Sequence, residues 1–274
     1  MSFAAYHRRI SLIREMFLDT ADQNYIGARA AFFEHRDHDF WWLTLHAVEK
    51  YLKAALLMNG ASASKPTHNI QVLLGRLKKI DPRLEPPPFV RPKFAGGAGW
   101  FETANDDFVR NLNVYGSPTN RYAAFSYVIA DIDIFRADHL VYWARRHALV
   151  FKTDTSGEQI DWIAELEANP RLWRHLSGAP LEKLLDLPRS DVRRQTFRRW
   201  NVAFFPELRP RRRQKRGALA HNAGIYRSIE VLRGSAQGSQ ERSEHREVLQ
   251  WVIDNVFLPK EEVIELNAIL DAHP

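Results

Sequence analysis

The sequence contains no cysteine among its 274 residues. Disulfide bonds and zinc sites with thiolate ligands are therefore excluded. The first residues, MSFAAYHRRI, bring His7, Arg8 and Arg9 before any apolar run develops, which is not the pattern of a secretory signal peptide. We therefore expect a cytoplasmic protein.

A long uncharged hydrophobic stretch is also missing. The most apolar segment, FWWLTLHAVEKYLKAALLMNG from Phe40 to Gly60, carries Glu49, Lys50 and Lys53 near its middle. Each such charge costs roughly 3 kcal/mol at the centre of a bilayer, so we expect no membrane span here. Apolar residues wrap most of the helix that this segment would form. This pattern predicts the central helix of a bundle, with Gly60 as its stop signal.

The net charge of +6 is unevenly distributed along the chain. The segment from Arg189 to Arg216 contains eleven Lys or Arg residues and two acidic residues, a local charge of +9, so the rest of the chain carries −3. The basic character therefore belongs to one segment and not to the whole fold.

Aromatic residues alternate with arginines in the first part of this basic segment, at Phe197, Trp200, Phe204 and Phe205. One interpretation is that the arginines bind phosphates while the aromatic rings stack on bases. The other is that the rings pack this part of the chain onto the bundle while the arginines face water. The helical spacing of the rings favours packing.

Hydrophobic residues at helical spacing predict an all-α fold, with no strand pattern in the first half. The predicted helices cover residues 16–35, 40–60, 70–77, 100–113, 122–147, 159–168, 181–185, 192–202, 246–257 and 261–270. A change of composition at FKTDTSGEQ, residues 151–159, predicts a helical bundle over 1–150 and a smaller helical extension over 151–274. Polar stretches predict a flexible basic loop over 206–245 within the extension.

Four segments in order, FLDTADQNYIGARAAF, FWWLTLHAVEKYLKAALLMNG, PTHNIQVLLGRL and YGSPTNRYAAFSYVIADIDIFRADHLVYWARRH, resemble the HEPN family of helical domains. The similarity runs from about Met16 to His147. It implies an antiparallel bundle of four or five helices that forms a homodimer. It also implies that Glu49, Lys50 and Lys53 mark the polar edge of a core helix, at a bundle seam or a dimer face.

Many members of this family cleave RNA without a metal, using an Arg followed after four to six residues by a His. Others bind nucleotides or mediate contacts. At the corresponding position this chain reads RNLNVYG, so Arg110 and Asn111 match while Tyr115 replaces the His. A phenol with a pKa of about 10 is a poorer base near neutral pH than an imidazole at about 6.5. The resemblance therefore favours binding, with Arg110, Asn111 and Arg121 as contacts, over cleavage.

Two other pairs have the Arg and His spacing by count. Arg29 and His35 lie on the first predicted helix, away from the family position. Arg216 and His221, in RGALAHN, follow the basic run, where a solvated arm is the simpler interpretation. We therefore regard Arg216 and His221 only as alternative catalytic candidates beside Arg110 and Tyr115.

Two motifs contain residues that can bind metals, but neither predicts a metal site. His35 and His38 in EHRDHD lack further residues to complete a tetrahedral site. Asp131 and Asp133 in DIDIFRADH would point about 200° apart on a helix. We expect no metal and no cofactor.

Three functions remain open from the sequence. The first is binding of RNA or a nucleotide by a dimeric bundle, in a toxin–antitoxin or defence context with a nucleotidyltransferase as a possible partner. Contacts from the basic arm would come from Arg211, Arg212, Arg213 and Arg216. The second is a metal-independent ribonuclease. The third is a scaffold without enzymatic activity, in which these arginines keep a loop soluble or bind an acidic protein.

Overall fold

A computed structural model of the chain describes residues 3–64, 68–92, 104–118, 120, 127–148, 161–169, 178–208, 219–221, 224–256, 258 and 260–274. These residues are mainly helical and include one pair of three-residue strands, so the all-α prediction is confirmed. The chain divides into two compact units. One comprises residues 1–116 and 130–217, and the other comprises residues 117–129 and 218–274.

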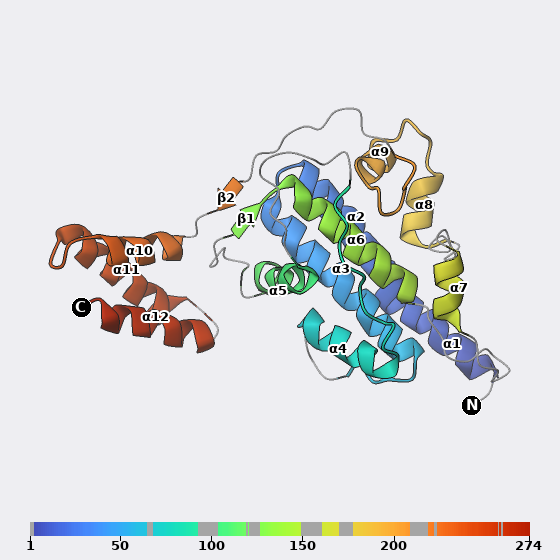
Figure 1. Cartoon of the computed structure of the whole chain (residues 1–274), viewed down its shortest axis with the longest axis horizontal. Helices are drawn as coiled ribbons and strands as arrows, with labels where there is room; N and C mark the ends of the chain where they lie inside the picture. Colours follow the sequence, from blue (N-terminus) through green and yellow to red (C-terminus); the bar gives the residue numbers. More distant parts are fainter. Residues whose placement is uncertain are drawn as a thin grey trace. The chain divides into compact units, whose positions relative to one another are not determined.

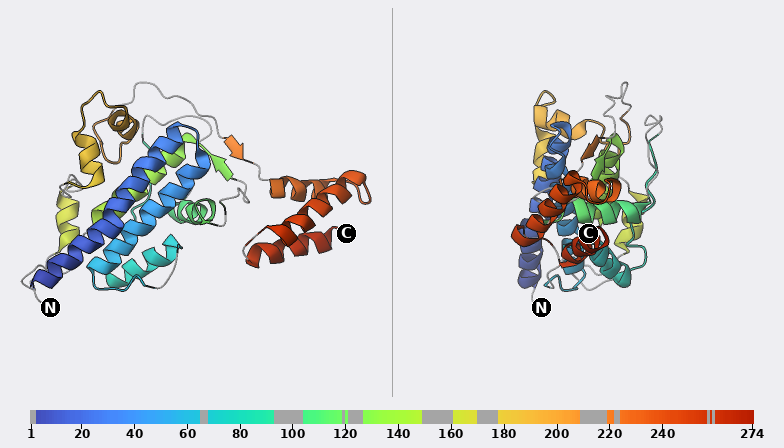
Figure 2. Two further views of the ribbon diagram at one scale, coloured as in Figure 1. Left: turned by 180° about the vertical axis from the view of Figure 1, so that it is seen from behind. Right: turned by 90° about the vertical axis from the view of Figure 1, so that its left-hand side faces the viewer.

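The first unit is a helical bundle around a central helix, α3 (Asp37–Met58). Figure 1 labels its helices. In chain order the other elements of this unit are α1 (Phe3–Ile13), the π-helical turn η1 (Arg14–Leu18), which the figure does not label, α2 (Asp19–Phe33), α4 (Ile70–Ile80), α5 (Asn105–Tyr115), α6 (Asp131–His147), α7 (Trp162–Ala168), α8 (Pro180–Asp186) and α9 (Val192–Arg198). Helix α3 contacts α2, α4, α5 and α6, and Figure 2 shows α2 and α3 side by side. The predicted central position of this helix is confirmed.

Helix α3 is central because apolar side chains cover most of its circumference. Its fully buried residues include Phe40, Trp41, Leu45, Val48, Tyr51 and Leu52. The helix ends where Gly60 adopts a φ of 73° and donates its N–H to the Leu57 carbonyl over 3.1 Å. Ala61 donates to the Leu56 carbonyl over 2.9 Å, which completes a Schellman-type cap. The stop predicted at Gly60 is confirmed.

Helix α5 packs on α3 through a position that only glycine fits. A Cβ at Gly116, directly after α5, would lie 2.5 Å from the Trp41 carbonyl oxygen and 2.7 Å from Leu45 Cβ. Helix α5 itself begins at Asn105 instead of residue 100, and residues 100–103 lie outside the described part of the chain.

The long helix predicted over 122–147 is shorter than expected. Helix α6 begins at Asp131, and residues Tyr127–Ile129 form the strand β1. The Asp133 side chain accepts a hydrogen bond of 2.8 Å from the Ala130 N–H, which satisfies one of the amides left free at a helix start. Asp133 therefore caps α6, a role that the sequence pattern of this segment did not indicate.

The second unit contains β1, its antiparallel partner β2 (Leu219–His221) and the helices α10 (Gly224–Gly234), α11 (Gln240–Asn255) and α12 (Lys260–Ala272). Tyr127 is paired with His221 in the strand register. Five buried leucines form the core of the helical part: Leu232, Leu249, Leu258, Leu266 and Leu270.

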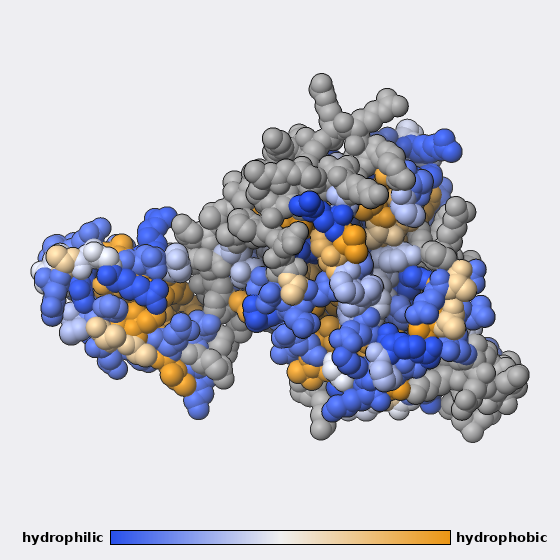
Figure 3. Space-filling view, viewed as in Figure 1, coloured by the Kyte–Doolittle hydropathy of each residue, from blue (hydrophilic) through white to orange (hydrophobic). Residues whose placement is uncertain are grey.

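The prediction of a flexible loop over 206–245 is wrong for most of residues 224–245. Residues 224–234 form α10, and α11 begins at Gln240 behind Ser239, whose hydroxyl accepts from the Arg242 N–H over 3.3 Å. The polar composition of these helices misled the prediction, although Leu232 of α10 and Leu249 of α11 are buried and partly buried apolar residues of both helices pack against them. Figure 3 shows the polar surface that results, with apolar patches between hydrophilic residues on this unit.

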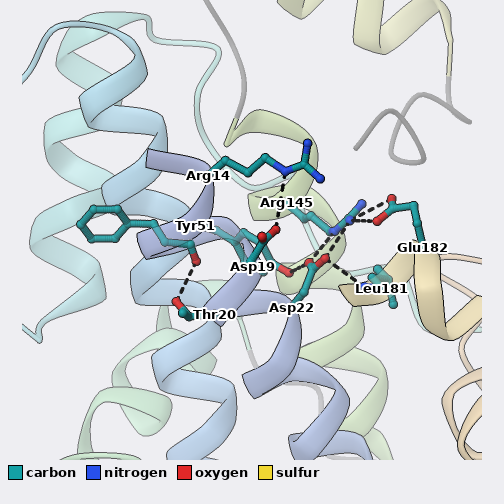
Figure 4. Close-up of polar contacts among 9 residues, drawn as sticks. Arg14, Asp19, Thr20, Asp22, Tyr51, Arg145, Leu181 and Glu182 are labelled. Carbon is teal, nitrogen blue, oxygen red and sulfur yellow. Dashed lines mark hydrogen bonds and ion pairs between the residues drawn. The ribbon is translucent and has the colours of Figure 1, made fainter. Parts of the chain in front are cut away.

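The compact units also differ from the predicted division at residue 150, because α8 and α9 belong to the bundle. Arg145 on α6 donates to Asp22 on α2 and to both oxygens of Glu182 on α8, over 2.8 to 3.0 Å (Figure 4). Asp22 also accepts from the Leu181 N–H over 3.2 Å and from the Tyr51 hydroxyl. These buried polar contacts tie residues 180–186 to the first helices of the chain.

A second buried network ties α9 to the bundle. Arg29 on α2 donates to Asp138 on α6 and to the Arg199 carbonyl, and Tyr25 donates to Asp138 over 2.7 Å. Asn201 reaches the Tyr25 hydroxyl over 3.1 Å. Burial, together with the charge of Asp138, raises the pKa of the Tyr25 hydroxyl, so this group stays protonated as a donor.

Candidate functional site

The predicted Arg110 and Tyr115 lie on α5 and have different environments. Arg110 is exposed and donates to Asp107 over 2.6 Å, one turn earlier on the same helix. Tyr115 is half-buried, with its ring centroid 5.4 Å from that of Trp41. Burial raises the pKa of the Tyr115 hydroxyl, and the negative charge of Asp133 raises it further. This raised pKa makes Tyr115 a still weaker base than a free phenol.

The structure describes only some of the other predicted contacts. Asn111 is half-buried on α5. Arg121, Arg211, Arg212, Arg213 and Arg216 lie outside the described residues. The main chain of His221 is part of β2 in the second unit, whereas α5 belongs to the first.

A polar surface connects α5 with the start of α4. Asn113, one turn after Arg110, accepts from the Ile70 N–H over 2.9 Å and donates to Asn69 over 3.2 Å. Asn69 is the N-cap of α4 and accepts from the N–H groups of Gln71 and Val72. The cap of α4 is thereby fixed against α5.

His68, the residue before this cap, reaches back to the central helix. Its Nδ1 lies 3.1 Å from Glu49 Oε2 on α3. The other carboxylate oxygen of Glu49 accepts from Lys53 Nζ over 2.5 Å, and His46 Nδ1 lies 3.6 Å from Oε2. The His46 ring packs on Trp42 with 4.1 Å between ring centroids. Four ionisable side chains thus meet at the point where α3 contacts the start of α4.

Glu49 is ionised in this cluster although it is buried. Burial alone would raise the pKa of its carboxyl, but the interactions with His46, Lys53 and His68 outweigh burial and lower the pKa to about 2. Glu49 and Lys53, which the resemblance places at the polar edge of a core helix, contact each other, and Glu49 also contacts two histidines. Lys50 lies apart from it and donates to Asn24 over 2.7 Å.

Sequence reasoning missed His46 and His68. The spacing from His46 to Glu49 and Lys53 places these three on one side of a helix, which the sequence alone indicates. His68 is 19 residues from Glu49, and no local pattern connects the two.

The described part of the basic segment, residues 189–208, forms a second candidate surface. The rings of Phe197, Phe204 and Phe205 are buried, and the first two contact Tyr25 on α2. The packing interpretation is therefore confirmed for these three rings. The fourth ring, that of Trp200, is half-buried and packs against Phe33 and Phe135.

The arginines of this segment lie at the surface. Arg189, Arg193 and Arg199 are exposed, and Arg194 and Arg198 are half-exposed. Two carboxylates face them: Asp191 accepts from Arg193 over 2.9 Å and Glu207 accepts from Arg198 over 3.4 Å. Residues 189–208 therefore carry five positive and two negative charges on their outer side.

The metal motifs considered in the sequence have other roles or partners. Asp133 caps α6. His35 has a positive φ of 60° in the turn between α2 and α3, and Arg36 pairs there with Glu34 and Asp39. Among the described residues, no group of three or more His, Asp or Glu side chains is arranged to hold a metal ion. Within the same residues, no helix has the length and apolarity needed to cross a membrane.

Comparison of the chain with models of known protein families, with curated proteins and with solved structures gives no significant match in any of the three. The geometry of the two surfaces described above is therefore the basis for the function proposed below.

Proposed function

We propose that this chain is an HEPN-type RNA-binding protein that contacts the phosphate backbone through the arginines of α9 and its flanking residues. One observation carries the proposal: the aromatic rings of this segment are buried in the bundle, while Arg189, Arg193 and Arg199 are exposed. The segment is held in place by the Arg29 contact to the Arg199 carbonyl and by the packing of Phe197. A folded surface with several cations suits a polyanion better than a single nucleotide.

The proposal keeps the biological setting that the resemblance implies. The protein acts as a homodimer in a toxin–antitoxin or defence system, with a nucleotidyltransferase as a possible partner. Arg110 on the exposed side of α5 adds a contact to RNA, whereas Tyr115 contributes less because it is half-buried and its ring packs on Trp41. Scaffolding without RNA is the competing function, and it requires no role for either set of arginines.

The experiment is a salt titration of RNA affinity, measured by fluorescence anisotropy with a labelled single-stranded RNA. Each phosphate contact contributes about −0.7 to the slope of log K against log salt on a single strand, so replacing Arg189, Arg193 and Arg199 together by Ser is expected to reduce the slope by roughly two. A matched control replaces Lys78, Lys79 and Arg83 by Ser, which removes the same charge from α4 and the residues that follow it. Equal slopes in the two triple variants would reject α9 as the phosphate surface.

The basic run that follows is tested in the same assay. Replacing Arg211, Arg212 and Arg213 by Ser is expected to lower RNA affinity and to leave the melting temperature nearly unchanged. An unchanged affinity would assign this run to solvation, and a large drop in melting temperature would show that it is packed.

The contribution of α5 is tested with Arg110→Ala, Tyr115→Phe and His221→Ala. We expect Arg110→Ala to weaken RNA binding and the other two variants to bind as wild type does. If none of the arginine variants affects RNA affinity, the scaffold function replaces this proposal.

A further inference from the structure

The outer side of α11 carries an exposed tryptophan. Trp251 is 59% exposed and Val248, three residues earlier, is 48% exposed, whereas Leu249 on the opposite side of the helix is completely buried. In the part of the chain that the structure describes, the Trp251 ring contacts no other aromatic ring and its indole N–H donates no hydrogen bond. Tryptophan is among the residues that contribute most to binding at protein interfaces, so this position suits a contact with a partner.

Acidic side chains surround this apolar pair on the same side of the helix. Glu247 and Asp254 lie four residues before and three residues after Trp251, and Glu244 lies four residues before Val248. Residues at these spacings are neighbours on a helix surface. All three carboxylates are exposed, and two of them accept hydrogen bonds from glutamine side chains. Among the described residues, no Lys or Arg side chain pairs with any of the three.

The arginines of α11 lie on its inner side and do not neutralise these carboxylates. Arg242 is half-buried and donates to a main-chain carbonyl between α10 and α11 over 3.4 Å. Arg246 donates to the carbonyls of Leu270 and His273 at the end of α12. Residues 224–274 contain five Lys or Arg residues and nine Asp or Glu residues, a net charge of −4 in a chain of net charge +6. The outer face of α11 is therefore acidic.

The charge of this face determines which ligand fits it. Carboxylates around an apolar centre repel RNA and anionic membrane surfaces, and they attract cations. A guanidinium or ammonium group can lie over the indole ring of Trp251 while it pairs with Glu247 or Asp254. The apolar stem of the same Arg or Lys side chain can cover Val248. The face spans about 24 Å along the 16 residues of α11, which a second helix can follow.

We propose that the outer face of α11 is a docking site for a basic helical segment of another protein. An Arg or Lys of that segment lies over Trp251 between Glu247 and Asp254, and an apolar residue beside it packs on Val248. This inference does not rest on RNA binding, because α11 belongs to the second unit and the arginines of α9 belong to the first. It gives the C-terminal helices a function of their own, the recruitment of a basic protein.

The first test measures the affinity of the full chain for a fluorescein-labelled helical peptide by fluorescence anisotropy. The peptide has 16 residues, the length of α11, with leucines along one side and arginines on both flanks of them. We expect wild type to bind this basic peptide, and binding to weaken as salt screens the carboxylates. Trp251→Ala is expected to raise the Kd about 30-fold, the effect of losing a central interface tryptophan.

Control variants separate the α11 face from exposed apolar residues in general. Val248→Ala is expected to weaken binding of the basic peptide. Its matched control is Val72→Ala on α4, because the two valines are 48% and 49% exposed. The control should bind the peptide as wild type does. Because Trp251 is largely exposed, Trp251→Ala should melt near the wild-type temperature and should bind RNA as wild type does.

A charge exchange tests the acidic residues independently of Trp251. Glu247→Lys is expected to weaken binding of the basic peptide about tenfold. The same variant is expected to bind a second peptide with Glu in place of every Arg, which wild type should not bind. Glu265→Lys on α12 changes the net charge by the same amount and should leave both affinities near those of wild type. Equal effects of the two charge variants would mean that only net charge matters, and this would overturn the inference.

The remaining outcomes distinguish other occupants of the face. A basic peptide that wild type does not bind, or that Trp251→Ala binds equally well, would overturn the inference. Binding that appears only after Arg211, Arg212 and Arg213 are replaced by Ser would overturn it in favour of the basic run of this chain. A dimer that Trp251→Ala converts to a monomer, in a protein that ignores the peptide, would assign the face to a second copy. Failure of wild type to bind RNA would overturn only the proposed function.

Discussion

Arg145 Nε on α6 donates a hydrogen bond of 2.8 Å to Asp22 Oδ1 on α2, and both side chains are completely buried. The same guanidinium group donates to Glu182 on α8. One cation therefore neutralises carboxylates from two elements that are far apart in the sequence. Burial raises the pKa of Glu182, and the charge of Arg145 counteracts this effect.

Replacing Arg145 by Met is expected to destabilise the protein by about 3–5 kcal/mol, because two carboxylates would stay buried without their cation. Urea denaturation followed by circular dichroism measures this difference. The control is Arg193→Ser, which breaks the exposed pair with Asp191 and should leave the denaturation midpoint near that of wild type. Similar midpoints for both variants would show that the buried network contributes no more than a surface pair.

Gly116→Ala is expected to destabilise the bundle by about 1–3 kcal/mol, the usual cost of overpacking. The added methyl group would lie 2.5 Å from the Trp41 carbonyl, and main-chain atoms of a central helix cannot move aside easily. Gly75→Ala in α4 is the matched control: its Cβ would meet no atom within 4 Å. This control is expected to stabilise α4 by about 0.5–1 kcal/mol, since alanine favours helix more than glycine does. Thermal melts of both variants measure these changes in stability. Equal shifts in melting temperature would contradict the prediction.

The Glu49 cluster is expected to make stability depend on pH in the acid range. The pKa of Glu49 is about 2 in the folded protein, below the ordinary 4.5, so its contribution is fully present above the ordinary value. That contribution decreases as pH falls toward the folded pKa, because protonation removes the charge that Lys53 and the histidines stabilise. The stability difference between wild type and Glu49→Gln should therefore be constant near neutral pH. It should narrow between about pH 5 and pH 2.

Urea titrations of the two proteins at several pH values measure this trend. Replacing the exposed Glu34, which pairs with Arg36 at the surface, by Gln provides the control for general acid effects. A difference for Glu49→Gln that does not change with pH would mean that the charge of Glu49 does not stabilise the fold.

The homodimer implied by the family resemblance is expected to be present at micromolar concentration. Light scattering after size-exclusion chromatography should then give about twice the chain mass of 31.8 kDa. A strict monomer across the concentration range would reject a dimer as the RNA-binding form.

Much of the first unit could be predicted from the sequence because local signals determine it. The apolar periodicity of α3 and its end at Gly60 are consequences of neighbouring residues, and the sequence predicted both the central helix and this stop. Helices α8 and α9 were also placed within a few residues. The start of α6 was misplaced because the apolar residues before Asp131 continue a helical pattern, although Tyr127–Ile129 pair with β2 instead.

The candidate site was predictable only in part. Arg110 and Tyr115 were identified by their resemblance to a family motif, and the structure gives them the exposed and half-buried environments described above. His68 was missed because its importance arises from a contact with Glu49, and a contact over 19 residues leaves no spacing to detect.

The sequence by itself determined that this chain is helical, which helix is central, where that helix ends, and that its basic charge is concentrated in one segment. These properties follow from periodicity, propensity and composition, which act between near neighbours. Only the tertiary structure decided that residues 180–208 pack onto the bundle, and that Glu49 meets His68. Both outcomes depend on polar groups that are favourable when buried only if partners from distant parts of the chain satisfy them, and only folding brings such partners together.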